Sequence, residues 1–408
     1  MKKILILVLF VIPIQIITAQ TRVITTGVPF LLVAADARAA GLGDQGVATS
    51  SDGFSQQWNP AKYAFSNEKQ GFALSYTPYL TSLVNDISLG QFNYFNRLDE
   101  RNAFSGSIRY FGLGEIELRE TAEQVPRIVK PGEFAIDGAY ALKLSNNFSM
   151  SVGARFISSN LRIPTAGDNS TSAAANTFAF DVAGFYQSEE VALADFNGRW
   201  RAGFNFQNLG PKINYESDQN DVGSNFLPAN MRLGGGFDFI LDEYNKVSLN
   251  LEITKLLVPT PPQTIEAVVI DTNGNGVISS TEIAEANAIA ETANAAAYSD
   301  YRKTGWVSGI FKSFNDAPGG FKEEMQELTY SLGAEYTYQD SFSLRTGYFY
   351  ESPEKGARQF FTLGAGFKYN VVKVDLSYLF SASKVKNPLE NTLRFSLSFN
   401  FGDKYDDN

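Results

Sequence analysis

Residues 271–282, DTNGNGVISSTE, carry oxygen-bearing side chains at the spacing of the EF-hand calcium loop. Gly276 permits the sharp turn that such a loop needs. Asparagine replaces a possible carboxylate at two positions, so we predict weak binding, suited to extracellular calcium levels. The candidate ligands are Asp271, Asn273, Asn275, the carbonyl of Val277, Ser279 and both carboxylate oxygens of Glu282.

The same residues have a second interpretation, without a metal. Ser279 or Ser280 would cap the N-terminus of an alanine-rich helix predicted over residues 281–298, and Glu282 would complete a capping box. The sequence leaves both interpretations open.

The chain has no cysteine and no histidine. The first absence excludes disulfides and thiolate zinc sites. The second removes the commonest general base, so a Ser-His-Asp hydrolase cannot be assembled. Carboxylates, tyrosine or a Ser-Lys pair could still catalyse, but the sequence offers no such constellation. We therefore expect no enzyme and no catalytic residue, and a calcium ion is the one cofactor to consider.

The N-terminus reads as a secretory signal. Lys2 and Lys3 precede an apolar run over residues 4–17, and the next residues favour cleavage after Ala19. The run is too short to span a membrane as a helix. The whole chain has 34 basic and 44 acidic residues, and loss of the signal makes it more acidic, so nucleic acid is not an expected partner.

The elements that would position these residues are strands. From Leu328 to Phe401, five successive stretches alternate strictly between apolar and polar residues. Successive strand side chains point to opposite faces, so one face can meet lipid and the other a polar lumen. Weaker or equal runs lie upstream, at 71–78, 87–95, 103–112, 134–144, 148–158, 177–186, 199–208, 230–240 and 246–255.

These runs predict an all-β fold: one transmembrane antiparallel barrel of about fourteen strands in the outer membrane. The connections alternate in length, and such barrels have short periplasmic turns and long external loops. Both termini are therefore expected in the periplasm. The predicted parts are a signal peptide (1–19), a periplasmic or plug segment (20–70), a barrel (71–401) with an external insertion (256–327) that contains a helix, and a periplasmic tail (402–408).

The segment before the first strand contains DARAAGLG at 36–43 and WNPA at 58–61, and it is too polar to face lipid. We predict a plug folded into the lumen, with Asp36 and Arg38 meeting inward charges such as Arg155 or Glu252. The alternative is a disordered periplasmic arm.

Several long strings in the chain are distinctive. They are NLGPKI at 208–213, LPANMRLG at 227–234, TKLLVPTPP at 254–262, KSFNDAPGGFKEE at 312–324, GAEYTYQDSFSLRTGYFYE at 333–351 and KGARQFFTLGAGFKY at 355–369. These strings resemble the PorV (also called LptO) family, outer-membrane proteins of the type IX secretion system that share a fourteen-stranded FadL-like barrel. WNPA resembles the wider FadL group. The resemblance implies nothing about the calcium-like loop.

The resemblance implies transport without catalysis. Cargo would be received by its C-terminal signal domain from a SprA-type translocon, and delivered to a PorU-type sortase with PorQ- and PorZ-like proteins, while the barrel sits in outer-membrane lipid. A plugged barrel conducts little, so function is expected on the external loops. The candidate partner-binding residues are Leu256, Leu257, Pro259, Pro261, Pro262, Phe314, Pro318 and Phe321. The alternative is that these residues only pack the loop onto the barrel rim.

Two other functions remain open. A FadL-like transporter of a hydrophobic small molecule predicts an apolar pocket beside the plug and a kinked strand, for which glycines 234–236 are candidates. A lipid-A deacylase would need unusual chemistry, because the chain has no histidine.

Overall fold

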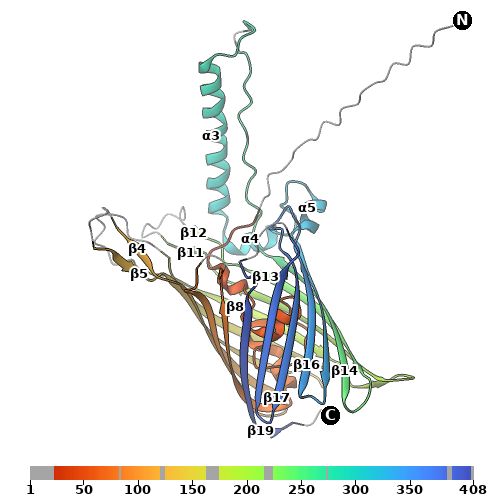
Figure 1. Cartoon of the computed structure of the whole chain (residues 1–408). Helices are drawn as coiled ribbons and strands as arrows, with labels where there is room; N and C mark the ends of the chain where they lie inside the picture. Colours follow the sequence, from red (N-terminus) through yellow and green to blue (C-terminus); the bar gives the residue numbers. More distant parts are fainter. Residues whose placement is uncertain are drawn as a thin grey trace, which may run out of the picture.

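A computed structural model describes residues 23–81, 84–119, 125–161, 174–215, 224–272, 274–383 and 388–405. The predicted signal peptide lies outside these residues. Fourteen long antiparallel strands form the wall of a barrel (Figure 1). They are β1 (Glu68–Pro78), β2 (Ile87–Arg97), β3 (Asn102–Leu113), β6 (Gly132–Lys143), β7 (Phe148–Asn160), β8 (Ala175–Gln187), β10 (Asn197–Leu209), β13 (Asn230–Ile240), β14 (Asn245–Leu256), β15 (Leu328–Tyr338), β16 (Phe342–Tyr350), β17 (Gln359–Tyr369), β18 (Val372–Ser381) and β19 (Leu393–Lys404).

Each strand of the wall pairs with its neighbours in the chain, and β1 pairs with β19, so the sheet closes and leaves no edge. The predicted fold class and strand number are confirmed. The connections contain short antiparallel strands. β4 (Ile116–Leu118) pairs with β5 (Arg127–Val129), β9 (Val191–Ala192) pairs with β10, and β11 (Ile213–Asn214) pairs with β12 (Ser224–Asn225).

The apolar and polar residues that alternate in the sequence alternate between the outer face and the lumen face of the wall. In β19, Arg394, Ser396 and Ser398 are buried toward the lumen, while Leu393 and Phe395 are 57% and 42% exposed on the outer face. An outer face of aliphatic and aromatic side chains suits lipid. Among the described residues, no helix is long and apolar enough to cross a membrane.

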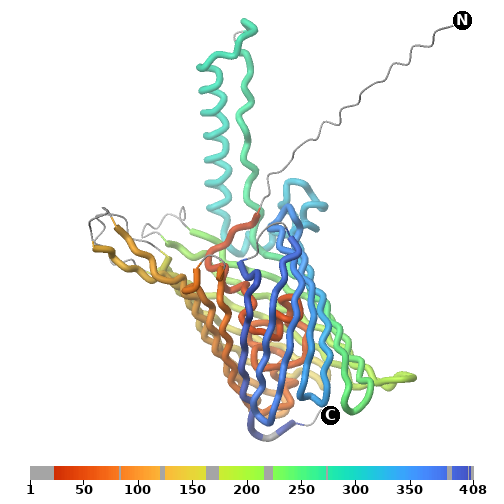
Figure 2. Tube along the Cα trace, in the orientation of Figure 1, coloured from red at the N-terminus to blue at the C-terminus, as the bar shows by residue number. Residues whose placement is uncertain are grey.

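The N-terminal segment fills the lumen as the predicted plug. It contains η1 (Pro29–Leu32), α1 (Ala37–Gly41), α2 (Ser55–Trp58) and η2 (Pro60–Phe65), all of them short and nearly all buried. Figure 2 shows this red segment running inside the barrel from one end to the other before β1 begins.

The two ends of the barrel differ. The end with the long connections, here called the loop end, carries α3 (Ser280–Lys303), α4 (Trp306–Lys312) and α5 (Phe321–Gln326), all between β14 and β15 (Figure 1). The opposite end, here called the turn end, has the tight turns, such as the one at Gln339 and Asp340, whose φ angles are 51° and 50°.

The described chain starts and finishes at opposite ends of the barrel. Gly27 donates its N–H to the carbonyl of Phe226 at the loop end, at 2.9 Å, whereas Lys404 pairs with Glu68 at the turn end. This differs from the expectation of two termini on one side, although residues 20–22 lie outside the described part. The reason is that the plug crosses the lumen only once.

Candidate functional site: the plug and the loop end

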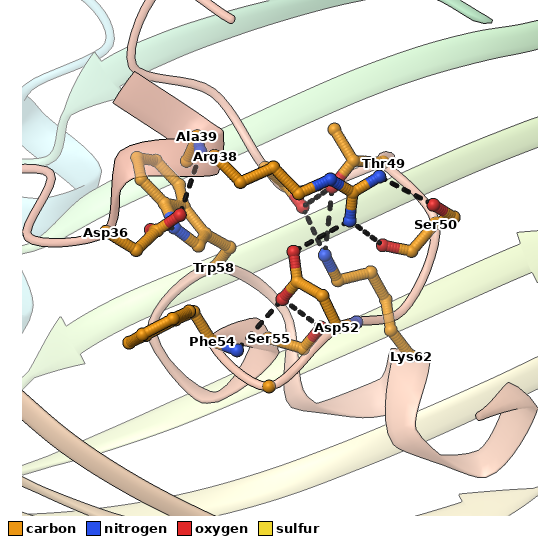
Figure 3. Close-up of polar contacts among 12 residues, drawn as sticks. Asp36, Arg38, Ala39, Thr49, Ser50, Asp52, Phe54, Ser55, Trp58 and Lys62 are labelled. Atoms are coloured by element: carbon orange, nitrogen blue, oxygen red, sulfur yellow. Dashed lines mark hydrogen bonds and ion pairs between the residues drawn. The ribbon is translucent and has the colours of Figure 1, made fainter. Parts of the chain in front are cut away.

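Arg38 fastens the plug to the wall. Its guanidinium donates to both oxygens of Glu335 on β15, at 3.1 and 2.9 Å, and to Asp52 within the plug at 2.7 Å. The hydroxyl and carbonyl oxygens of Ser50 accept from it as well (Figure 3). Arg345 of β16 contacts Glu335 from the other side. Because a two-point arginine–carboxylate pair fixes direction as well as charge, it sets the orientation of α1 in the lumen.

The predicted partners of the plug charges are mostly different from those observed. Arg155 is held by Asp137 and Asp181 on the neighbouring strands, at 3.0 and 2.9 Å, and does not reach Asp36 or Arg38. Strand neighbours lie closer to Arg155 than the plug does, because register places Asp137 directly opposite it.

Glu252, the other predicted partner, contacts the plug through backbone rather than through charge. Its Oε2 accepts the N–H groups of Gly46 and Val47 at 2.8 and 2.9 Å, while its Oε1 accepts from Arg232 at 2.9 Å. A carboxylate thus satisfies two buried backbone donors that have no strand or helix partner.

Asp36 and Trp58 come together from the two plug motifs. One Asp36 oxygen caps α1 by accepting the Ala39 N–H at 2.8 Å, and the other accepts the Trp58 indole N–H at 2.7 Å (Figure 3). Asn59 then donates to the carbonyls of Val47 and Gly184, both at 2.9 Å. Both motifs are therefore structural parts of the plug.

Glycines in the wall let the plug backbone approach closely. A Cβ at Gly347 would lie 2.2 Å from the Gly43 nitrogen, and one at Gly203 would lie 2.3 Å from the Val47 oxygen. Gly234 belongs to the same group, since its Cβ would lie 2.5 Å from Val47. β13 pairs regularly with both neighbours through residues 234–236, so these glycines do not kink the strand. Gly234 and Gly236 face the plug, whereas Gly235 is exposed on the outer face.

The lumen has an apolar cluster toward the loop end, whereas toward the turn end a second apolar cluster, around Tyr63, Phe95 and Phe185, lies beside a polar cavity. At the loop end Val28, Phe30 and Leu31 of the plug are buried against wall residues that include Leu89 and Phe111. At the turn end a cavity of about 570 Å³ is lined mostly by charged and hydroxyl side chains, among them Arg38, Asp52, Glu335, Asp375 and Ser398. The apolar part of the lumen is therefore occupied by the plug itself.

A second buried charge network, here called the rim cluster, holds the insertion onto the loop end. Lys255 at the end of β14 donates to Glu324 and Glu327, at 2.9 and 2.8 Å. Lys355, after β16, donates to Glu323 and Glu327, at 2.8 and 3.0 Å. All five side chains are at least nine-tenths buried. The cluster connects α5 to the end of β14 and to the connection that follows β16.

The rim cluster continues into the start of the insertion. The hydroxyl of Thr260 donates to Glu327 at 2.9 Å, and Asp316 accepts the Thr260 N–H and lies 3.1 Å from its hydroxyl. Burial, together with the charges of Glu324 and Glu327, raises the pKa of Asp316 above its usual value. Three carboxylates thus share two lysines, Asp316 joins them through Thr260, and the insertion is anchored at both of its ends.

Above this anchor, residues 306–326 form what we call the rim platform, which exposes large apolar side chains. Phe311 and Phe321 are 74% and 76% exposed. Val307, Phe314 and Met325 are also exposed. A monomer seldom presents so many large apolar side chains on one polar loop without a partner.

The eight predicted partner-binding residues divide into two groups. Leu257 and Pro259 are buried and Leu256 is half-buried, as the packing alternative expected. Pro259 packs against Gly309 of α4, and its carbonyl accepts from Tyr301 of α3. The other five are more accessible: Pro261 and Pro262 are half-buried, whereas Phe314, Pro318 and Phe321 are exposed. Whether any of them binds a partner stays a prediction.

The calcium-like loop lies at the tip of α3, far from the barrel (Figure 1). Asp271 accepts the N–H groups of Gly274 and Gly276, at 2.8 and 2.7 Å. Ser279 and Glu282 form a complete capping box at the start of α3. Of the predicted ligands, Asn273 lies outside the described residues.

Glu282 is the residue on which the two interpretations of this loop compete. Its Oε1 accepts from the N–H and hydroxyl of Thr272, and its Oε2 from those of Ser279. These hydrogen bonds lower the pKa of Glu282 to about 2, and the bond from the Ser279 N–H has the largest effect. A calcium ion would draw the carboxylate away from the capping box. In the described chain no group of three or more Asp, Glu, His or Cys side chains could hold a metal, so calcium here stays a prediction that rests on two carboxylates together with amide, hydroxyl and carbonyl oxygens.

Sequence reasoning missed the rim cluster. Its signal was present, because Glu323 and Glu324 lie within the string at 312–324 and Lys355 opens the string at 355–369. Charges placed just beyond the ends of membrane strands are ordinary, however, and only the fold brings these three side chains together.

A closed antiparallel wall of fourteen strands, filled by the chain's own N-terminal segment, defines an outer-membrane β-barrel with an internal plug. Residues 16–263, more than half of the chain, match the family described as "Type IX secretion system protein PorV". The chain belongs to the PorV family. No curated protein sequence matches it.

Solved structures similar to this one include FadL-type barrels. The Ralstonia pickettii toluene transporter TbuX is 12% identical, with 91% of this chain and 100% of that chain covered and a TM-score of 0.46. A Pseudomonas aeruginosa FadL homologue is 13% identical, with 91% and 99% covered and a TM-score of 0.44. The Pseudomonas putida toluene transporter TodX is 12% identical, with 93% and 98% covered and a TM-score of 0.44.

Proposed function

We propose that this protein carries secreted proteins at the outer membrane without catalysing a reaction. It would bind the C-terminal signal domain of a cargo protein as the cargo leaves a SprA-type translocon. It would then present the cargo to a PorU-type sortase with PorQ- and PorZ-like proteins. In this proposal the loop end faces the cell exterior and the turn end the periplasm. Membership of the PorV family supports a role in type IX secretion.

The observation that carries the proposal is the contrast between a filled lumen and a braced loop end. The plug occupies the apolar part of the lumen and is bonded to the wall through Arg38 and Glu252. The rim cluster, meanwhile, holds the rim platform in one position. A barrel whose lumen is filled and whose external platform is held rigidly is suited to binding another protein rather than to conducting a solute.

The side chains best placed to receive cargo are those of the rim platform. Phe311, Phe314 and Phe321 are exposed although they lie directly above a buried anchor. Aromatic residues on a rigid support are favourable anchors in protein interfaces, because little side-chain entropy is lost when they are covered. The buried members of the predicted set, Leu257 and Pro259, would support the platform from below.

The test uses cells that lack this protein. Secreted proteins should accumulate unprocessed and unattached in the deletion strain, and wild-type protein should restore them. A variant in which Phe311, Phe314 and Phe321 are all serine should insert normally but fail to restore attachment, and fail to co-purify with a tagged cargo signal domain. Serine at Phe361, which faces outward on β17, is the matched control. Normal secretion in the deletion strain would contradict the proposal.

The transporter alternative lacks its expected features in the described residues. It predicts an apolar cavity beside the plug and a kink at glycines 234–236. The cavity beside the plug is polar, and the strand runs regularly through these glycines.

A further inference from the structure

The insertion contains an extended segment that runs beside a helix. Residues 263–270 rise from the loop end alongside α3, and together they form what we call the spike, residues 263–303 (Figure 1). Along α3 only Glu282 and Ala290 are buried, so the spike packs on little besides itself. At its base, Phe226 and Tyr301 pack with ring centroids 5.6 Å apart.

The backbone of this segment is almost unpaired. In the described structure, residues 261–270 make no backbone–backbone hydrogen bond. One side chain holds them: the amide of Asn294 on α3 accepts the Ile265 N–H at 2.7 Å and donates to the Ile265 carbonyl at 2.9 Å. This pair of bonds imitates a strand partner at one residue.

The Asn294 contact also determines which edge is free. In an extended chain, the N–H and C=O groups of successive residues point to opposite sides. Ile265 directs its groups toward α3, so a regular extended course gives Ala267 the same direction and gives Glu266 and Val268 the opposite one. The outward edge therefore offers a row of donors and acceptors to another chain.

The side chains of the segment favour a strand as well. The stretch TIEAVVI at 264–270 is rich in β-branched residues, and Ile265, Val268 and Ile270 are 54%, 75% and 64% exposed. Proteins usually protect a free edge with lysine, proline or a bulge, and residues 263–270 contain no lysine or proline.

The charge of the spike indicates the kind of partner. Residues 263–303 contain six acidic residues and two basic ones, and the basic pair, Arg302 and Lys303, lies at the base of the spike. Glu266 lies within the extended segment itself, and the others flank it at the tip and on α3. A partner with a basic edge is attracted to this surface, and one with an acidic edge is repelled.

We propose that residues 263–270 are a docking strand, which pairs edge to edge with a β-strand of positive charge in a partner sheet. The inference rests on the proposed function in naming that partner: the sheet belongs to the cargo's C-terminal signal domain. The rim platform would then hold the cargo from below, and the spike would hold it from the side.

The test compares two proline variants of the full-length protein in detergent. Val268→Pro removes a donor from the outward edge, whereas Ala267→Pro removes one that faces α3, and both keep the extended conformation that proline and its predecessor favour. Binding of a purified signal domain from a secreted protein of the same cells is measured by fluorescence anisotropy. We expect Val268→Pro to weaken binding at least about tenfold, Ala267→Pro to change it less than about twofold, and added salt to weaken it.

The outcomes separate the two proposals. If wild-type protein binds the signal domain and both proline variants bind it equally well, the docking strand is wrong while the proposed function stands. If wild-type protein does not bind it, both fail. If wild-type protein is a dimer that Val268→Pro converts to a monomer, the strand pairs with a second copy of this chain, and the cargo assignment is overturned.

Discussion

The plug and the spike are both alanine-rich, but the plug is buried in the lumen whereas the spike is exposed. In the plug, Ala34, Ala35 and Ala37 are completely buried, and the helix α1 is only five residues long. In the spike, α3 has 24 residues and only two of them are buried. Alanine content alone therefore does not decide between a packed segment and an exposed helix. What differs is the means of attachment.

The plug is held by contacts with distant parts of the chain, and the spike mostly by contacts within itself. Arg38 joins α1 to Glu335 of β15, which lies 297 residues further along the chain. The spike depends on its own capping box at Ser279 and on Asn294. A buried charge with several partners fixes one position, whereas local bonds fix a shape and leave the surface available.

The strongest way to break this contrast is to remove the central arginine of the plug. Arg38→Ala leaves Glu335 and Asp52 buried without their main partner, which should lower the free energy of unfolding by about 3–5 kcal/mol. Thermal unfolding in detergent measures the loss. Lys246→Ala breaks only an exposed pair with Asp340 and should cost less than about 1 kcal/mol. Equal losses in the two variants would show that the plug is not held by charge.

A second change loosens the loop end while leaving the plug in place. Glu327→Ala removes the carboxylate that Lys255 and Lys355 share, which should cost about 1–3 kcal/mol locally and leave α5 held only by the Lys255–Glu324 and Lys355–Glu323 pairs. The expected result is rapid proteolysis within residues 311–326, with barrel unfolding unchanged. Glu354→Gln, at an exposed position nearby, is the control. Proteolysis no faster than in the control would mean that the platform does not depend on the rim cluster.

Removing the spike should affect the barrel least. Replacing residues 263–298 by a short Gly-Ser link keeps Tyr301 on Phe226 and removes no side chain from the lumen. The free energy of unfolding should then change by less than about 0.5 kcal/mol, as for surface changes in general. Calorimetry in detergent checks this. A larger loss would show that the spike supports the barrel after all.

The smallest expected effect concerns the tip of the spike. Calcium should protect the chain from protease near Ile278, with half-saturation at about 10⁻⁴–10⁻³ M, typical of extracellular sites. Asp271→Ala should abolish the protection, while the capping box of Ser279 and Glu282 remains. Protease sensitivity that is the same with and without calcium in wild-type protein would leave the capping box as the whole explanation of this motif.

The strands could be predicted from the residues because membrane strands obey a local rule. Alternation with a period of two, about ten residues long, reports lipid on one side and lumen on the other, and every strand from β1 to β19 that forms the wall was predicted within a few residues. The insertion between Leu256 and Leu328 and its helix followed for the same reason, since their composition departs from that pattern.

The partners of buried charges could not be predicted in this way. Arg38 meets Glu335 and not Arg155 or Glu252, and Lys255 meets Glu324 and Glu327, because closure of the barrel and the path of the plug bring together residues that are far apart in the chain. The same holds for the first described residues, which lie at the loop end because the plug crosses the lumen once. Periodicity is a property of neighbours along the chain, whereas the pairing of charges in a closed lumen depends on three-dimensional proximity, and that is decided only when the barrel closes around its plug.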